Sequence, residues 1–120
     1  MQSIEDFFKE LYDNFNGRRI EKVITQMAEN VKWANGMEGG FVYGHDGVRE
    51  YWLRQFKLIS SKVTPLKISQ AENLVVIDVR QVVHDTEGKL LMDEQVKHIF
   101  TLENGKVSEF QIGKIEEKEK

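Results

Sequence analysis

The chain has 120 residues, with 17 Lys and Arg against 20 Asp and Glu, and its formal net charge is −3. This is the length of one domain, and the slightly acidic balance argues against nucleic acid or an anionic membrane as a partner. The absence of cysteine excludes disulfides, a thiol nucleophile and a thiolate metal site. Because the longest aliphatic run spans only 74–77 and no leader pattern opens the chain, we expect a cytoplasmic domain.

The first half of the chain predicts three helices. Apolar residues recur at helical spacing over 4–15, after a capping Ser3, and again over 20–27. Alternation over 31–35 predicts a short strand, which leads into a glycine-rich loop over 36–40. The third helix is expected to carry one apolar face made of Val48, Tyr51, Trp52, Phe56 and Ile59.

From residue 60 onward the chain predicts strands. Pro65 interrupts the first of them and indicates an edge position or a bulge. Dense β-branched residues over 74–84 predict the next strand, and residues 90–102 the one after it. An Asn-Gly pair at 104–105 indicates a hairpin that leads into a last strand over 107–112.

Helices followed by consecutive strands predict an α+β fold with a mainly antiparallel sheet. We expect this sheet to curve into a cone over the three N-terminal helices and to leave a concave, mostly apolar pocket. Residues 1–120 are expected to form one domain, with 116–120 as a charged tail.

Four segments resemble the nuclear transport factor two-like superfamily, in its SnoaL-like and ketosteroid-isomerase-like branch. They are NGRRI (16–20), MAENVKW (27–33), VYGHDGVREYW (42–52) and VKHIFTLENGKV (96–107). The resemblance implies the cone-shaped, cystatin-like fold, a pocket lined by the inner sheet face and the first helix, and a homodimer packed through the sheet. It implies less about function, because this fold hosts isomerases, cyclases, hydrolases, transport factors and binding domains.

Ketosteroid isomerases combine a carboxylate base with an oxyanion hole made by a Tyr and a protonated Asp. By position, the resemblance places the base at Asn35, the acid near Glu94 and the Tyr near Leu11, with Tyr12 one residue further round the helix. An Asn cannot act as the base, so the standard isomerase mechanism is not expected. The aspartate that SnoaL-like cyclases use in the pocket also lacks an inward-facing counterpart in this chain.

Glu94 and His98 are the candidate catalytic residues. They share one face of a predicted strand with Val96 and Phe100, which is the composition of a pocket wall. Their backbones are about 13 Å apart, a separation suited to flanking a ligand. The structural alternatives are a core histidine satisfied by one hydrogen bond and a solvated carboxylate at the end of a strand.

The remaining pocket candidates are mostly aromatic, and the two tryptophans also suit a plain core. Gln81 is predicted to face inward among apolar neighbours, where a ligand or another side chain must satisfy its amide. Met37 is a further wall candidate, and Glu38 is either a lid carboxylate or a surface residue. The expected ligand-binding residues are Tyr12, Trp33, Asn35, Trp52, Phe56 and Gln81.

Two functions remain open from the sequence. The first is a SnoaL-like domain that binds a small apolar ligand, as an acid–base isomerase or cyclase of a carbonyl compound. Glu94 or His98 would then move the proton, while Asn35 and Gln81 hold the oxygen. The second is a non-catalytic dimeric binding or scaffold domain with a vestigial pocket. No metal, phosphate-loop or nucleophile motif is present, so no cofactor is expected.

Overall fold

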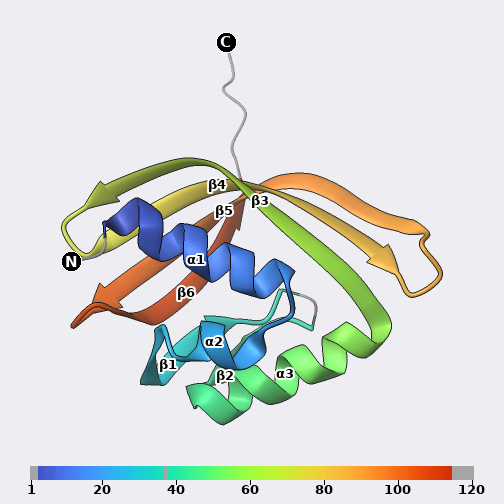
Figure 1. The fold of residues 1–120 in the computed structure, drawn as a ribbon, viewed down its shortest axis with the longest axis horizontal. Helices are drawn as coiled ribbons and strands as arrows, with labels where there is room; N and C mark the ends of the chain where they lie inside the picture. The colour runs from blue at the N-terminus through green and yellow to red at the C-terminus, as the bar shows by residue number, and fades with distance from the viewer. Residues whose placement is uncertain (1–2, 37, 115–120) are drawn as a thin grey trace.

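The computed structural model describes residues 3–36 and 38–114, with three helices and six strands in them (Figure 1). None of these helices is long and apolar enough to cross a membrane. In chain order the elements are α1 (Ile4–Asn16), α2 (Ile20–Ile24), β1 (Met27–Ala34), β2 (Phe41–Tyr43), α3 (Gly44–Leu58), β3 (Ile59–Ala71), β4 (Leu74–Asp85), β5 (Leu90–Glu103) and β6 (Lys106–Lys114).

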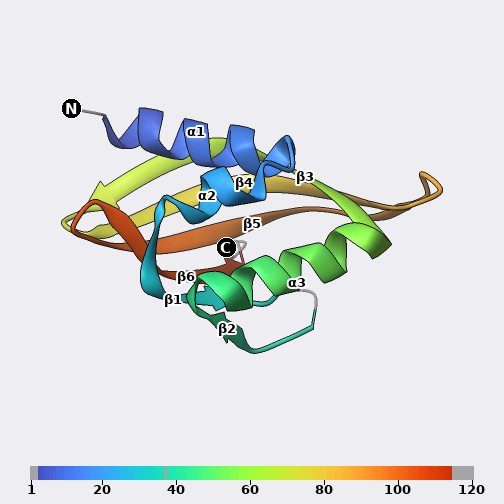
Figure 2. The same cartoon turned by 60° about the horizontal axis from the view of Figure 1, so that its bottom comes forward.

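The six strands form one sheet in the order β2-β1-β6-β5-β4-β3. The β1–β6 pair is parallel and all the other pairs are antiparallel. The long strands bend strongly, and α1 and α3 pack against the curved sheet (Figures 1 and 2). The predicted α+β fold with a curved, mainly antiparallel sheet over N-terminal helices is therefore confirmed.

Local sequence signals explain where α1 begins and ends. The Ser3 side chain accepts a hydrogen bond from the backbone N–H of Asp6 at 3.1 Å, which caps the first turn. Gly17 follows the last helical residue, but Arg18 rather than this glycine takes the left-handed conformation, with φ at 62°. The Arg18 guanidinium lies 4.3 Å from the centre of the Phe56 ring, a packing contact that holds this turn in place.

The same turn joins α1 to the edge strand β3. The Asn16 side chain donates to the carbonyl oxygen of Val63 at 2.8 Å and accepts from the N–H of Val63 at 2.9 Å. These two hydrogen bonds satisfy the backbone of one residue of β3 in the way that a neighbouring strand would. It fixes the distance between the first helix and one wall of the hollow.

Two element boundaries differ from the predictions. The second helix ends at Ile24 instead of 27, because Met27 already pairs with Val107 of β6. The third helix ends at Leu58, and Ile59 is the first residue of β3, where it pairs with Asp85. In both cases pairing with a distant strand overrides the local helical spacing.

The inward face of the sheet follows the predicted alternation. In β4 the inward residues Val75, Ile77, Val79 and Val83 are all buried, and in β5 the buried residues are Val96, His98 and Phe100. β3 is an edge strand, and its register with β4 shifts just after Pro65. The proline therefore marks both an edge and a bulge, which satisfies both predicted alternatives.

Candidate ligand-binding site

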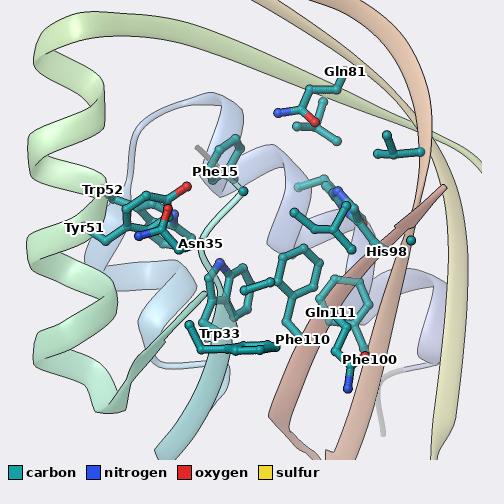
Figure 3. Close-up of a pocket in the computed structure, with 18 of the residues that line it drawn as sticks. Phe15, Trp33, Asn35, Tyr51, Trp52, Gln81, His98, Phe100, Phe110 and Gln111 are labelled. Carbon is teal, nitrogen blue, oxygen red and sulfur yellow. The ribbon is translucent and has the colours of Figure 1, made fainter. Parts of the chain in front are cut away.

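A hollow of about 540 Å³ lies between α1, α3 and the inner face of the sheet (Figure 3). Its volume falls within the range of small-molecule sites, about 300 to 1,000 Å³. Figure 3 shows Tyr51, Trp52 and Asn35 on one side, His98 on the opposite side and Gln81 at the top. The predicted residues that line it are Tyr12, Trp33, Asn35, Trp52, Gln81, Glu94 and His98.

Packed aromatic rings form the floor and one side of the hollow. Trp33 stacks on Phe110 with ring centres 4.2 Å apart, and Trp52 meets Trp33 edge-on at 5.5 Å. Phe100 packs against Phe110 at 5.0 Å. Both tryptophans are buried and also line the hollow, so the core and the pocket wall are the same layer of side chains here.

A neutral polar pair, Tyr12 and His98, interrupts these apolar walls. The Tyr12 hydroxyl of α1 lies 2.8 Å from Nδ1 of His98 on β5, and both side chains are buried. Burial raises the pKa of the Tyr12 phenol and lowers the pKa of His98 to about 3, so neither group carries a charge at neutral pH. Within the described part of the chain, Tyr12 is the hydrogen-bond partner of this imidazole, and both residues line the hollow.

These properties narrow the chemistry of the two catalytic candidates. An imidazole whose pKa is about 3 is a weak base at neutral pH, so His98 is better suited to hydrogen bonding than to proton abstraction. Glu94 lies opposite Gln81 in the β4–β5 register and is exposed at the edge of the hollow. The structure therefore brings both candidates to one cavity, with His98 in its buried part and Glu94 in its exposed part.

Asn35 lines the hollow, but Glu38 holds its side chain. The amide oxygen accepts from the backbone N–H of Glu38 at 2.8 Å, and the amide nitrogen donates to the Glu38 carboxylate at 3.0 Å. Arg54 and Gln55 of α3 donate to the same carboxylate at 3.1 and 2.8 Å. The Arg54 hydrogen bond, with that of Asn35, lowers the pKa of Glu38. Glu38 is therefore a bridge from the glycine-rich loop to α3, and it is not a lining residue.

Gln81 faces the hollow as predicted, and its amide makes one long contact, 3.5 Å to the hydroxyl of Ser61. Phe56 was predicted to bind the ligand, but the structure places it outside the lining of the hollow. It lies one turn beyond Trp52 on α3, where its ring packs against Phe15 and under the Arg18 guanidinium. Met37 lies outside the described residues.

Several lining residues were missed as site candidates. Tyr51 precedes Trp52 on the predicted apolar face of α3, and it too reaches the hollow. Phe110 and Ile112 on β6 also line the hollow. Their period-two spacing, which is typical of one face of a strand, could have predicted this. Phe15 could have been found from its place on the same apolar helix face as Tyr12. No group of three or more His, Asp or Glu side chains in the described residues is arranged to hold a metal ion.

The curved sheet, the flanking helices and the aromatic hollow define an α+β domain with a concave, mostly apolar pocket. Residues 8–110 match the family model of the SnoaL-like domain, and the chain belongs to that family. This agrees with the resemblance seen in the four sequence segments. A comparison with curated proteins found no significant match.

Solved structures with the same fold cover nearly the whole chain. An NTF2-like protein of unknown function from Burkholderia pseudomallei K96243 has a TM-score of 0.83 and 22% identity, over 96% of this chain and 92% of that one. A putative polyketide cyclase from Pseudomonas putida KT2440 has a TM-score of 0.81 and 10% identity, over 93% and 91%. TerC, co-crystallised with polyporic acid, has a TM-score of 0.79 and 22% identity, over 88% and 86%. At these identities the likeness shows the fold alone.

Proposed function

We propose that this SnoaL-like domain binds a small, mostly apolar organic compound in the hollow between α1, α3 and the sheet. The observation that carries the proposal is a cavity of about 540 Å³ with aromatic walls and the uncharged Tyr12–His98 pair. Apolar cavities with a few polar groups are the usual form of small-molecule sites. The fold neighbours fit this proposal, since they include a protein crystallised with polyporic acid and a putative polyketide cyclase.

Thermal unfolding tests the proposal against a panel of apolar carbonyl compounds, namely steroids, polyketide-like aromatics and terpenoids. A compound at a hundred times its dissociation constant should add about 2.7 kcal/mol of apparent stability. We expect at least one chemical class to raise the midpoint in a concentration-dependent way. If no member of the panel does so, the alternative of a scaffold domain with a vestigial pocket is favoured instead.

Acid–base catalysis is the second candidate, and the position of Glu94 favours it. Among the described lining residues Glu94 is the one carboxylate. It would take a proton from the carbon next to a ligand carbonyl, while the Tyr12–His98 pair donates a hydrogen bond to the carbonyl oxygen. Asn35 cannot replace Glu94 as the base, because an amide accepts no proton at neutral pH.

Glu94→Gln is expected to slow this proton transfer by at least about 100-fold and to leave binding intact. The measurement is deuterium exchange next to the carbonyl of a compound that the thermal assay identifies. Glu103→Gln, at the exposed end of the same strand, is the matched control. Equal exchange rates in the wild type and Glu94→Gln would contradict catalysis by Glu94, and only the proposal of ligand binding would stand.

We also propose that two copies pair through the outer face of the sheet, in the cytoplasm. That face carries an ion pair of Lys97 with Asp78 at 3.2 Å, one of Arg80 with Asp93 at 2.7 Å, and the half-buried Ile99. Such a mixed surface suits a wet interface. A monomeric mass at micromolar concentration in sedimentation equilibrium would contradict the dimer.

A further inference from the structure

We propose that Asn104, at the tip of the β5–β6 hairpin, is a site of spontaneous deamidation that converts its side chain to aspartate and isoaspartate. This residue belongs to one of three Asn-Gly pairs in the chain, at 16–17, 35–36 and 104–105. The structure separates the three, because it holds the first two amides in hydrogen bonds and leaves the third exposed. The inference is independent of what the hollow binds.

Asn-Gly is the pair of residues at which this reaction meets the least hindrance. The main-chain nitrogen of the glycine attacks the side-chain amide carbon of the asparagine, and ammonia leaves as a five-membered succinimide ring closes. Water then opens the ring at one of its two carbonyl groups, which gives either aspartate or isoaspartate. Because glycine has no Cβ, its nitrogen is accessible and its backbone adapts to the ring. Water is the only co-reactant.

The tip of the hairpin leaves both reacting groups free. Residues 103–106 are all exposed, and the turn places Asn104 at φ 53° and Gly105 at φ 79° between the paired Glu103 and Lys106. Within the described part of the chain, the Asn104 amide has no hydrogen-bond partner, and the N–H of Gly105 donates to no acceptor. Exposed loop tips of this kind are also where a chain opens most easily.

At the first pair both the amide and the attacking nitrogen are bound. The Asn16 side chain donates to the carbonyl oxygen of Val63 at 2.8 Å and accepts from the N–H of Val63 at 2.9 Å. The N–H of Gly17 donates to the carbonyl oxygen of Asp13 at 3.0 Å. Ring closure at Asn16 therefore requires α1 to separate from β3 and its last turn to open.

At the second pair the amide is buried and bound to Glu38. The Asn35 side chain accepts from the backbone N–H of Glu38 at 2.8 Å and donates to its carboxylate at 3.0 Å. Arg54 and Gln55 hold the same carboxylate from α3. Ring closure at Asn35 thus needs a local opening of the fold, and its free-energy cost does not apply at Asn104.

The product marks the surface of the protein in two ways. Either acid adds a negative charge to the formal net charge of −3. Isoaspartate also routes the main chain through the side-chain carbon, so the turn becomes longer by one atom. An enzyme that transfers a methyl group from S-adenosylmethionine to isoaspartyl carboxylates would find this carboxylate accessible, since the four residues of the turn are exposed.

Peptide mapping by mass spectrometry tests the inference on protein incubated at mildly alkaline pH, once folded and once in guanidinium chloride. In the folded protein Asn104 is expected to deamidate at least about tenfold faster than Asn16 or Asn35, because only these two need a local opening. In guanidinium chloride the three Asn-Gly pairs lose their different surroundings, so their rates should agree within about threefold.

Methylation by an isoaspartyl methyltransferase with labelled S-adenosylmethionine provides a second readout on the aged, folded protein. Asn104→Gly removes the amide and suits the positive φ of the turn, so this variant should accept at least about tenfold less methyl label than the wild type. Asn73→Gly is the matched control in the exposed turn between β3 and β4. Asn73 precedes a leucine, and its replacement should leave the label unchanged.

Three results would overturn the inference. They are a folded-state rate at Asn104 no higher than at Asn16 or Asn35, a rate difference that persists unchanged in guanidinium chloride, and methyl label that survives Asn104→Gly. Rates that differ in the folded protein and converge on unfolding support it. The rates come from the wild-type chain, so the test does not depend on whether a variant folds.

Discussion

Lowering the pH from 7 to 5 is expected to reduce the free energy of unfolding by about 2 kcal/mol through His98 alone. Burial lowers the pKa of this imidazole to about 3 in the folded protein, from an ordinary value of 6.5. Between these two values the unfolded chain binds a proton that the folded protein does not bind. Stability therefore rises with pH through this window and is lost as the pH falls.

Urea unfolding at pH 7, 6 and 5 measures this effect. His98→Gln keeps an acceptor for the Tyr12 hydroxyl and should lose most of the pH dependence, whereas His84→Gln, at a half-buried position on β4, should keep it. The comparison stops at pH 5 because carboxylates with lowered pKa values, such as Glu38 and Asp93, lose their own stabilising effect at lower pH. Equal slopes in the wild type and His98→Gln would contradict a buried, neutral imidazole.

Trp52→Ala is expected to cost about 3 kcal/mol of stability, near the lower end for large-to-small changes of a buried aromatic residue. The ring is 4% exposed and packs against Phe15 at 5.4 Å and Trp33 at 5.5 Å. Part of its surface faces the hollow rather than other side chains, which is why the cost stays at the lower end. Any compound that binds in the hollow should lose more than tenfold in affinity, because one aromatic wall disappears.

Chemical denaturation and calorimetry measure the two effects of Trp52→Ala separately. Leu53→Ala is the matched control, since this neighbour on α3 is 50% exposed and should change stability by less than about 0.5 kcal/mol. Trp52→Phe keeps a ring in the wall and provides a milder variant if the alanine form is too unstable. A stability loss below about 1 kcal/mol for the alanine variant would contradict the packing described for this wall.

Residues on strands were the easiest part of the site to predict. Side chains alternate strictly along a strand, so the inward face that carries His98 and Phe100 follows once one buried residue is known. Helical residues were harder, because the apolar stripe of α3 is wide enough to serve both the core and the hollow. Trp52 and Phe56 share that stripe, and only the first of them reaches the cavity.

Contacts between distant segments could not be predicted from spacing. The Tyr12–His98 pair joins residues 86 positions apart, and Tyr12 was one residue off the position that the resemblance indicated. The bridge from Glu38 to Arg54 likewise depends on how α3 packs beside the glycine-rich loop. The parallel pairing of β1 with β6 has no local signal, and it is the reason that the second helix ends early.

Fluorine NMR of the protein labelled with 5-fluorotryptophan tests the central claim, a ligand site in the hollow, most directly. The chain has two tryptophans, Trp33 and Trp52, and both line the hollow. Each of the two resonances therefore reports on the wall of the hollow. Titration with a compound that raises the unfolding midpoint should shift both resonances with the same saturation curve. If the compound stabilises the protein while both resonances stay in place, it binds elsewhere, and the claim that the hollow is the ligand site is wrong.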